Sequence, residues 1–156
     1  MADLADRTRA VLEGDLRPGE SILAATQAQL DGGTMRLASR IGGGVAGGAL
    51  GAAIAASVDS ADDLEQRLTN GLVLAVTEQR VVLLDVTAVA ARPKSVVLSL
   101  ERDRVTAVVA GDKRVMLVKL PTIALTLDGD DEQVLRFEVP KTSRRDATSV
   151  VDALGG

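Results

Sequence analysis

Residues 72–86 read LVLAVTEQRVVLLDV, two apolar runs separated by the polar residues 77–80. Both runs are short and rich in β-branched side chains, which is typical of neighbouring strands in a sheet. The polar residues between them are enough for a tight turn. This stretch therefore predicts a β-hairpin, with one strand over Leu72–Val76 and the next over Val81–Val86.

The rest of the chain continues this pattern of short strands. Apolar segments separated by turn residues recur at the spacing of an antiparallel sandwich or barrel. Gly111–Lys113 is expected to be a turn, and Pro121 is expected to bend or interrupt a strand. The further strands are expected at Ser21–Leu30, Ser95–Leu100, Val105–Val109, Val115–Leu120, Thr122–Leu127 and Leu135–Val139.

Alternation within the strands predicts which side chains enter the core. Because successive residues of a strand point to opposite faces, apolar residues two apart share one face. Phe137 is the only aromatic residue, so the core must be built mostly of Val, Leu, Ile and Ala. The expected inward residues are Val96, Leu98 and Leu100, then Val105, Ala107 and Val109, then Ile123, Leu125 and Leu127, and finally Leu135, Phe137 and Val139.

Helical periodicity is expected at both ends of the chain. Residues 1–14 predict a helix over Ala2–Leu12 that packs at the edge of the domain, with Gly14 as a left-handed cap. After Pro140 the apolar period changes from 2 to 3.6, which predicts an amphipathic helix docked on the sheet and ended by Gly155. Its expected apolar face is Ala147, Val150, Val151 and Leu154, with Ser143 and Asp146 as a weak capping box.

The composition excludes several kinds of functional site. The chain has 156 residues, enough for one domain with a hydrophobic core. It contains no His, Cys, Tyr or Trp, which excludes imidazole bases, thiolate nucleophiles, Cys/His zinc sites and disulfides. A net charge of −4 has the wrong sign for nucleic-acid binding. We expect a non-enzymatic protein with no catalytic residue, cofactor, metal or nucleic-acid partner.

Two stretches of the chain carry a family resemblance. Residues 16–23 (LRPGESIL) place Pro-Gly-Glu before the first strand, and residues 74–83 (LAVTEQRVVL) place Thr and Arg at the hairpin turn. Together they resemble the bacterial PH-like and GRAM-like branch of the pleckstrin-homology superfold, over roughly residues 16–154 apart from one insertion. The chain departs from that pattern because its last helix has no Trp and its first hairpin lacks the basic motif of phosphoinositide binders.

The resemblance implies a fold and a domain arrangement. The fold class is mainly β: a PH-like barrel of about seven antiparallel strands capped by a C-terminal helix. Residues 1–14 form the N-terminal helix and residues 15–156 the PH-like domain. A Gly/Ala-rich helical insertion with a connecting helix, residues 34–70, interrupts this domain between its first two strands.

The core of this insertion, Ile41–Val58, reads IGGGVAGGALGAAIAASV and contains no charged residue. Small residues recur in it every four positions, which is the spacing that lets two helix backbones approach closely. The segment therefore predicts a glycine-zipper contact. One row begins with Gly43, Gly47 and Gly51, and a second row beside it begins with Gly44 and Gly48.

The sequence leaves the role of the insertion open. As a helix it would be about 27 Å long, slightly short of the about 30 Å hydrocarbon core of a bilayer. A single span would also put the first strand on the opposite side of the membrane from the other strands. The remaining interpretations are a helix that dips into the membrane interface, a helix pair across a dimer, and a flexible linker. If the helix meets a membrane, Arg36 and Arg40 are expected to contact lipid phosphates.

Two other motif matches lack the context that their chemistry needs. Gly42-x-Gly44-x-x-Gly47 fits the dinucleotide fingerprint, which makes a nucleotide-binding enzyme an alternative. That fingerprint belongs to parallel strands joined by crossover helices, whereas the expected strands are joined as hairpins. Asp128–Glu132 resembles a calcium loop, but Gln133 and Val139 stand where such a loop needs Gly and Glu.

These observations predict a non-enzymatic binding module. We expect a PH-like domain that associates with a membrane surface or a protein partner and self-associates through the glycine zipper as a homo-oligomer. An oligomeric scaffold without lipid binding is the alternative. The acidic N-terminal residues do not form a signal peptide, which predicts a cytoplasmic protein that can lie peripherally on the inner face of the membrane.

Replacing Gly47 with Leu tests the glycine zipper. A bulky side chain should prevent close contact of two helix backbones, so self-association should be lost although intrinsic helix propensity improves by about 1 kcal/mol. Analytical ultracentrifugation of the wild type and Gly47→Leu, with vesicle flotation alongside, measures the effect. Unchanged mass and unchanged flotation would leave the insertion as a linker.

Overall fold

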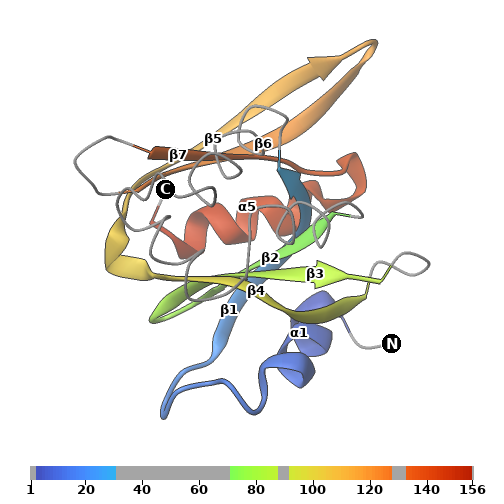
Figure 1. Cartoon of the computed structure of the whole chain (residues 1–156). Coiled ribbons are helices and arrows are strands. Elements are labelled where there is room, and N and C mark those ends of the chain that lie inside the picture. The colour runs from blue at the N-terminus through green and yellow to red at the C-terminus, as the bar shows by residue number, and fades with distance from the viewer. Residues whose placement is uncertain (1–2, 31–70, 88–91, 128–132, 156) are drawn as a thin grey trace, which may run out of the picture.

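The structure is a computed structural model that describes residues 3–30, 71–87, 92–127 and 133–155. These residues form a mainly β structure with a helix near each end (Figure 1). The elements are α1 (Leu4–Leu12), β1 (Ile22–Leu30), β2 (Leu72–Thr77), β3 (Arg80–Val86), β4 (Pro93–Glu101), β5 (Val105–Val115), β6 (Val118–Leu127), β7 (Gln133–Glu138) and α5 (Arg144–Ala153), with short 3₁₀ turns at Arg102–Arg104 and Lys141–Ser143.

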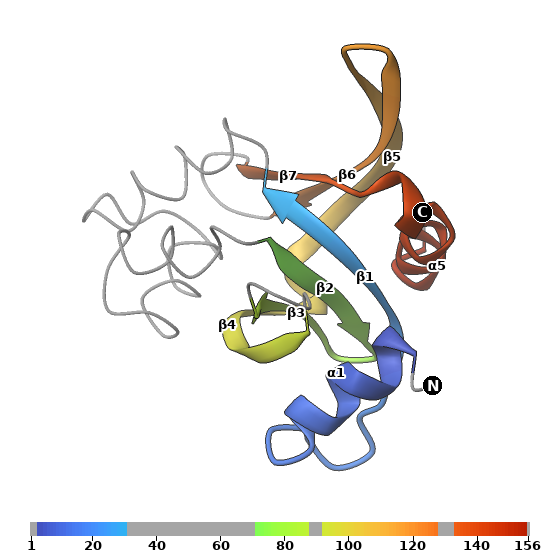
Figure 2. The same ribbon diagram turned by 90° about the vertical axis from the view of Figure 1, so that its right-hand side faces the viewer.

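The strands form one antiparallel sheet in the order β4-β3-β2-β1-β7-β6-β5. Strand β1 takes part in both halves of it: Ile22–Ala28 pairs with β2, whereas Gln29 and Leu30 pair with β7. The sheet therefore folds over at β1 into two layers, β1–β4 and β5–β7, and α5 lies at the open side between them (Figures 1 and 2). Seven antiparallel strands closed by a C-terminal helix fit a PH-like fold, as the sequence predicts.

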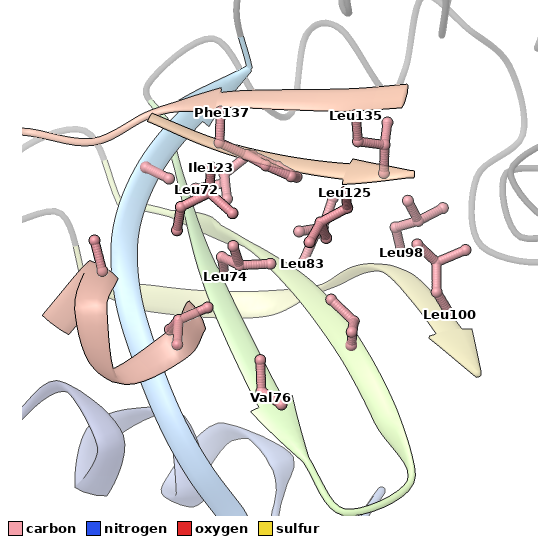
Figure 3. Close-up of a cluster of buried hydrophobic side chains, with 14 of the residues drawn as sticks. Leu72, Leu74, Val76, Leu83, Leu98, Leu100, Ile123, Leu125, Leu135 and Phe137 are labelled. Carbon is pink, nitrogen blue, oxygen red and sulfur yellow. The ribbon is translucent and has the colours of Figure 1, made fainter. Parts of the chain in front are cut away.

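The main core lies between the two layers and α5. Figure 3 shows side chains of both layers pointing toward one another, with Phe137 of β7 among Leu and Ile side chains. Phe137 is fully buried, and the expected inward positions Leu135 and Val139 are buried with it. The predicted face of the last helix is also confirmed, because Ala147, Val150 and Val151 are buried and Leu154 packs against the same core.

A second hydrophobic cluster lies on the outer face of the β1–β4 layer, under α1. Leu12 of α1 is fully buried there against alternate residues of β2 and β3. Strands β2 and β3 are consequently buried on both faces, which explains why their sequences are apolar runs rather than alternating patterns. The expectation that the first helix packs at the domain edge was wrong, since α1 covers a face of the sheet.

The ends of the helices also differ in part from the prediction. Helix α1 begins at Leu4, and Asp3 caps it by accepting a hydrogen bond from the Asp6 amide at 2.8 Å. Gly14 does not have the positive φ of a left-handed cap, so that expectation was wrong, whereas Gly155 at the end of α5 does. The expected capping box of α5 is not formed, because Ser143 makes no side-chain cap bond and is the last residue of a 3₁₀ turn.

Two β-bulges change which side chains face the core. In β4 a register shift places Val97 in the main core and turns Val96 toward the cluster under α1. In β5 a shift between Val105 and Ala107 brings Val108 to the core and leaves Val109 exposed. The predicted inward positions Val96, Ala107 and Val109 were therefore wrong, because strict alternation fails wherever one strand carries an extra residue.

A buried ion pair joins the two stretches that carry the family resemblance. The Arg80 guanidinium donates two hydrogen bonds to the Glu20 carboxylate, from Nη2 to Oε1 at 2.7 Å and from Nε to Oε2 at 3.0 Å. Thr77 Oγ1 and the Arg17 backbone N–H also donate to this carboxylate, at 2.7 and 3.0 Å. The Glu20 side chain is fully buried and the Arg80 side chain almost so. Each partner therefore depends on the other for its charge compensation.

Replacing Glu20 with Gln should destabilise the protein strongly. Arg80 would keep a buried charge without its counter-ion, and breaking such a pair costs about 3–5 kcal/mol. The matched control is Glu101→Gln, which removes the exposed partner of Arg17 and should cost far less. Urea denaturation measures both free energies of unfolding. Equal losses in the two variants would contradict the structural importance of the buried pair.

The same ion pair predicts how stability depends on pH. Hydrogen bonds from Arg80 outweigh the effect of burial and lower the pKa of Glu20 from 4.5 to about 2. A lowered carboxyl pKa stabilises the folded state above the unfolded value, and this contribution is lost as the pH falls toward the folded value. Between about pH 6 and pH 2 the wild type should lose about 3 kcal/mol more than Glu20→Gln. Urea denaturation at each pH measures the two free energies of unfolding. A difference between them that stays constant over this pH range would contradict the lowered pKa of Glu20.

Candidate functional site

The functional residues expected from the sequence lie outside the described part of the chain. The zipper glycines Gly43, Gly44, Gly47, Gly48 and Gly51, the lipid-contact candidates Arg36 and Arg40, and the alternative nucleotide motif Gly42–Gly47 all fall within residues 31–70. The acidic turn at residues 128–132 is likewise outside it. The candidate site of the described residues therefore contains none of the residues predicted from the sequence.

A two-stranded arm projects beyond the β5–β7 layer. Strand β6 pairs with β7 only over Thr122–Leu127, but its pairing with β5 continues to Val118 opposite Val115. Residues 112–121, here called the arm, thus extend past the last residues of β7 as a ribbon of two strands (Figures 1 and 2). Pro121 marks the root of the arm, where its carbonyl accepts a hydrogen bond from the Val139 amide at 2.8 Å.

The expected turn at Gly111–Lys113 was wrong. Gly111 has no positive φ and lies opposite Thr122, where an added Cβ would stand only 3.1 Å from Thr122 Oγ1. Glycine serves there as a close approach between strands rather than as a turn. The chain reverses instead at Met116 and Leu117, and Pro121 is accommodated within a continuous β6.

The end of the arm is apolar and exposed. Met116 and Leu117 are 89% and 94% exposed, and Val115 and Val118 beside them are also exposed. We call these four residues, Val115–Val118, the tip. Within the described ranges, the other exposed large hydrophobic residues are Val109, also on β5, and Leu23. A contiguous exposed apolar group of this kind commonly marks an interaction surface.

Basic residues flank the tip on both strands. Lys113, Arg114 and Lys119 are exposed, and Asp112 is the one acidic residue of the arm. The arm is therefore locally positive although the whole chain carries a net charge of −4. Arg114 lies directly opposite Lys119 in the strand register, so two like charges face each other on one side of the ribbon.

The residues at and beside the tip do not stabilise the arm. Like charges directly across a strand pair are destabilising, and exposed apolar side chains gain nothing in water. Met116 also adopts φ +55°, a conformation for which two-residue hairpin turns ordinarily use Gly, Asn or Asp. Facing like charges, exposed apolar side chains and a positive φ thus occur together within a few residues. Such a concentration of destabilising features is typical of a functional site.

The sequence contains a signal for this site, but it is ambiguous. In residues 113–119, KRVMLVK, an apolar run is bracketed by basic residues. The same run fits a buried strand, and only its position beyond the end of β7 shows that nothing in the described chain covers it. Lys113, Arg114 and Lys119 are exposed on the two strands that lead to the apolar end of the arm.

The described residues contain neither a cluster of metal ligands nor a helix that could span a membrane. No three side chains of His, Cys, Asp or Glu are grouped there so that they could hold a metal ion. Among the described helices, none has the length and apolar character required to cross a bilayer. The exposed arm is thus the most distinctive surface feature of this part of the chain.

Comparison with solved structures gives a likeness in fold. The sequence matches no protein-family model and no curated protein. Among solved structures, the chain is similar to the crystal structure of a pleckstrin homology domain from Shewanella amazonensis SB2B, with 13% sequence identity and a TM-score of 0.47. That likeness covers 99% of this chain and 100% of the other.

Proposed function

We propose that the protein is a non-catalytic PH-like binding module that attaches peripherally to anionic membrane surfaces through the tip of its arm. The observation that carries this proposal is the combination of an exposed apolar tip with basic residues on both flanks. Apolar side chains can enter the boundary between headgroups and acyl chains, while Lys and Arg remain at the level of the lipid phosphates. The cytoplasmic leaflet, which is rich in anionic lipids, is the surface that fits this charge.

The size of the tip predicts a weak and reversible attachment. Burying Met116 and Leu117 contributes about 1.5–3 kcal/mol each, and each nearby basic residue adds about 1 kcal/mol at an anionic surface. With the three basic residues of the arm the total is about 6–9 kcal/mol, which corresponds to dissociation constants from about 40 μM to below about 1 μM, and the cost of association weakens this binding further. One arm would therefore bind and release rather than anchor the protein permanently.

Self-association is a second candidate property, supported by the repeated spacing of Gly43, Gly47 and Gly51 in the sequence. Joining two copies would place two arms on one assembly. The second arm would then bind at a high effective concentration, which can raise the overall affinity by about 10²–10⁴-fold if both arms reach the same surface. A zipper contact would thus strengthen the same membrane attachment. Its test is the Gly47→Leu comparison described above.

A protein partner is the competing occupant of the tip. An apolar end flanked by basic residues could also enter a groove on an acidic protein. The membrane accounts better for the described geometry, because the apolar residues occupy the end of a projecting ribbon rather than a broad flat face. A projecting end suits insertion into a soft surface more than it suits the area of about 800 Å² per partner typical of stable protein interfaces.

Replacing Leu117 with Ser should weaken vesicle binding by about tenfold or more, since the most exposed apolar side chain would be lost. The matched control is Leu23→Ser, which removes an exposed Leu from β1. Flotation with vesicles of phosphatidylcholine containing phosphatidylserine measures the partition, with unfolding temperatures as a check on folding. Equal binding by the two variants would contradict the assignment of the tip.

The charge contribution has a parallel test. Lys119→Gln should weaken binding to phosphatidylserine-containing vesicles by about fivefold and change binding to pure phosphatidylcholine little. Lys94→Gln, at an exposed basic residue of β4, is the control. If neither wild type nor variants float with anionic vesicles, the membrane is not the partner and an acidic protein surface becomes the better explanation.

A further inference from the structure

Two ion pairs hold the root of the arm from opposite sides. Arg144 Nη1 lies 3.0 Å from Asp112 Oδ1, and Lys113 Nζ lies 2.5 Å from Glu138 Oε1. Asp112 and Lys113 are consecutive residues of β5, so their side chains leave the ribbon on opposite faces. Each face of the arm is therefore tied to a different part of the domain at the level where the third strand ends.

The two anchors belong to firmly packed elements. Arg144 is the first residue of α5, whose inner face is buried in the main core. Glu138 is the last residue of β7 and its side chain is only 13% exposed. The second Glu138 oxygen accepts a hydrogen bond from Gln29 Nε2 at 3.1 Å, which connects the arm to β1 at the fold between the two layers.

The arm needs such support because no third strand accompanies it. A two-stranded ribbon alone is at best marginally stable in water. The root also contains Gly111, whose lack of a side chain leaves the backbone free to bend where the three-stranded part ends. Without contacts on its two faces, the arm would be free to swing about its root.

We infer that these two ion pairs fix the direction of the arm, so that Arg144 and Glu138 are positioning residues for the tip. This inference rests on the proposed binding function of the tip. An arm held in one direction presents Met116 and Leu117 without first losing conformational freedom, which lowers the entropic cost of binding. Attachment through such an arm also holds the domain at a set orientation above the surface.

Replacing Asp112 or Glu138 with its amide distinguishes a positioning role of the ion pairs from a purely electrostatic effect on membrane binding. Asp112 and Glu138 are acidic groups at the root of an arm whose tip is proposed to meet anionic lipid. If charge alone mattered, replacing either with its amide would strengthen binding, because a repulsive charge would be removed. If the ion pairs position the arm, the same replacements should weaken binding. The two effects have opposite signs.

The experiment measures both the motion of the arm and its binding. The chain has no cysteine, so Met116→Cys provides a single attachment point for a spin label. In this background Asp112→Asn, Arg144→Gln and Glu138→Gln should each increase label mobility in solution. In the unlabelled protein each should weaken binding to phosphatidylserine-containing vesicles by about two- to fivefold. The double variant Asp112→Asn/Arg144→Gln should lose no more than either single variant, because both remove one pair.

Asp6→Asn is the matched control. It removes an acidic group that is ion-paired with Arg9 on α1, without a contact to the arm among the described residues. Label mobility should stay at the wild-type value, and binding should be equal or slightly tighter. Unfolding temperatures of all variants identify any change that comes from loss of folding.

Unchanged label mobility in the three arm variants would overturn the inference, as would increased mobility with equal or tighter vesicle binding. Failure of the proposed function gives a different result. If the wild type does not bind vesicles but the variants loosen the label, the ion pairs fix the arm and the membrane assignment is wrong. The mobility measurement needs no lipid, so the two failures are distinguishable.

Discussion

The arrangement of the domain depends on one buried carboxylate. Glu20 accepts hydrogen bonds from Arg80, Thr77 and the Arg17 backbone, and so joins the segment before β1 to the β2–β3 hairpin. Arg80 Nη2, which donates to Glu20, also donates to the Asp15 carbonyl at 3.0 Å, in the segment that follows α1. One ion pair therefore fixes the entry into β1, the turn between β2 and β3, and the connection from the helix that covers them. Because both charges are buried, removing either leaves the other without compensation.

This pair also shows why much of the fold could be predicted from the sequence. Pro-Gly-Glu and Thr-x-x-Arg were found as two separate motifs, and the structure shows that they are two halves of one contact. Local hydrophobic periodicity is visible directly in the sequence. It predicts the presence of the strands, the buried face of β7 and the docking of helix α5. The errors at Val96 and Val109 have a different origin. Each bulge depends on the register with a neighbouring strand, and a single strand's pattern does not contain that register.

The candidate site escaped prediction for a related reason. Residues 113–119 have the composition of a strand flanked by charges, and a strand is what they form. Their importance comes from the shortness of β7, which stops at Glu138 and leaves the end of the β5–β6 ribbon uncovered. Exposure is thus a consequence of the lengths of three strands relative to one another. The Gly/Ala-rich insertion differs from the arm in this respect, because its unusual composition is visible in the sequence without any such comparison.

A stiff arm and a weak tip have complementary consequences for binding. Under the proposed function each arm would contribute a small affinity, so attachment would respond strongly to the number of arms that act together. Stiffness decides whether two arms can act together at all, since freely swinging arms would spread their tips over many positions and lower the effective concentration of the second contact. We infer that the ion pairs of Asp112 and Lys113 would limit that spread at the root. The direction of the arm and the number of copies in the assembly would then together determine membrane attachment. Loss of either would leave a domain that folds normally and binds membranes poorly.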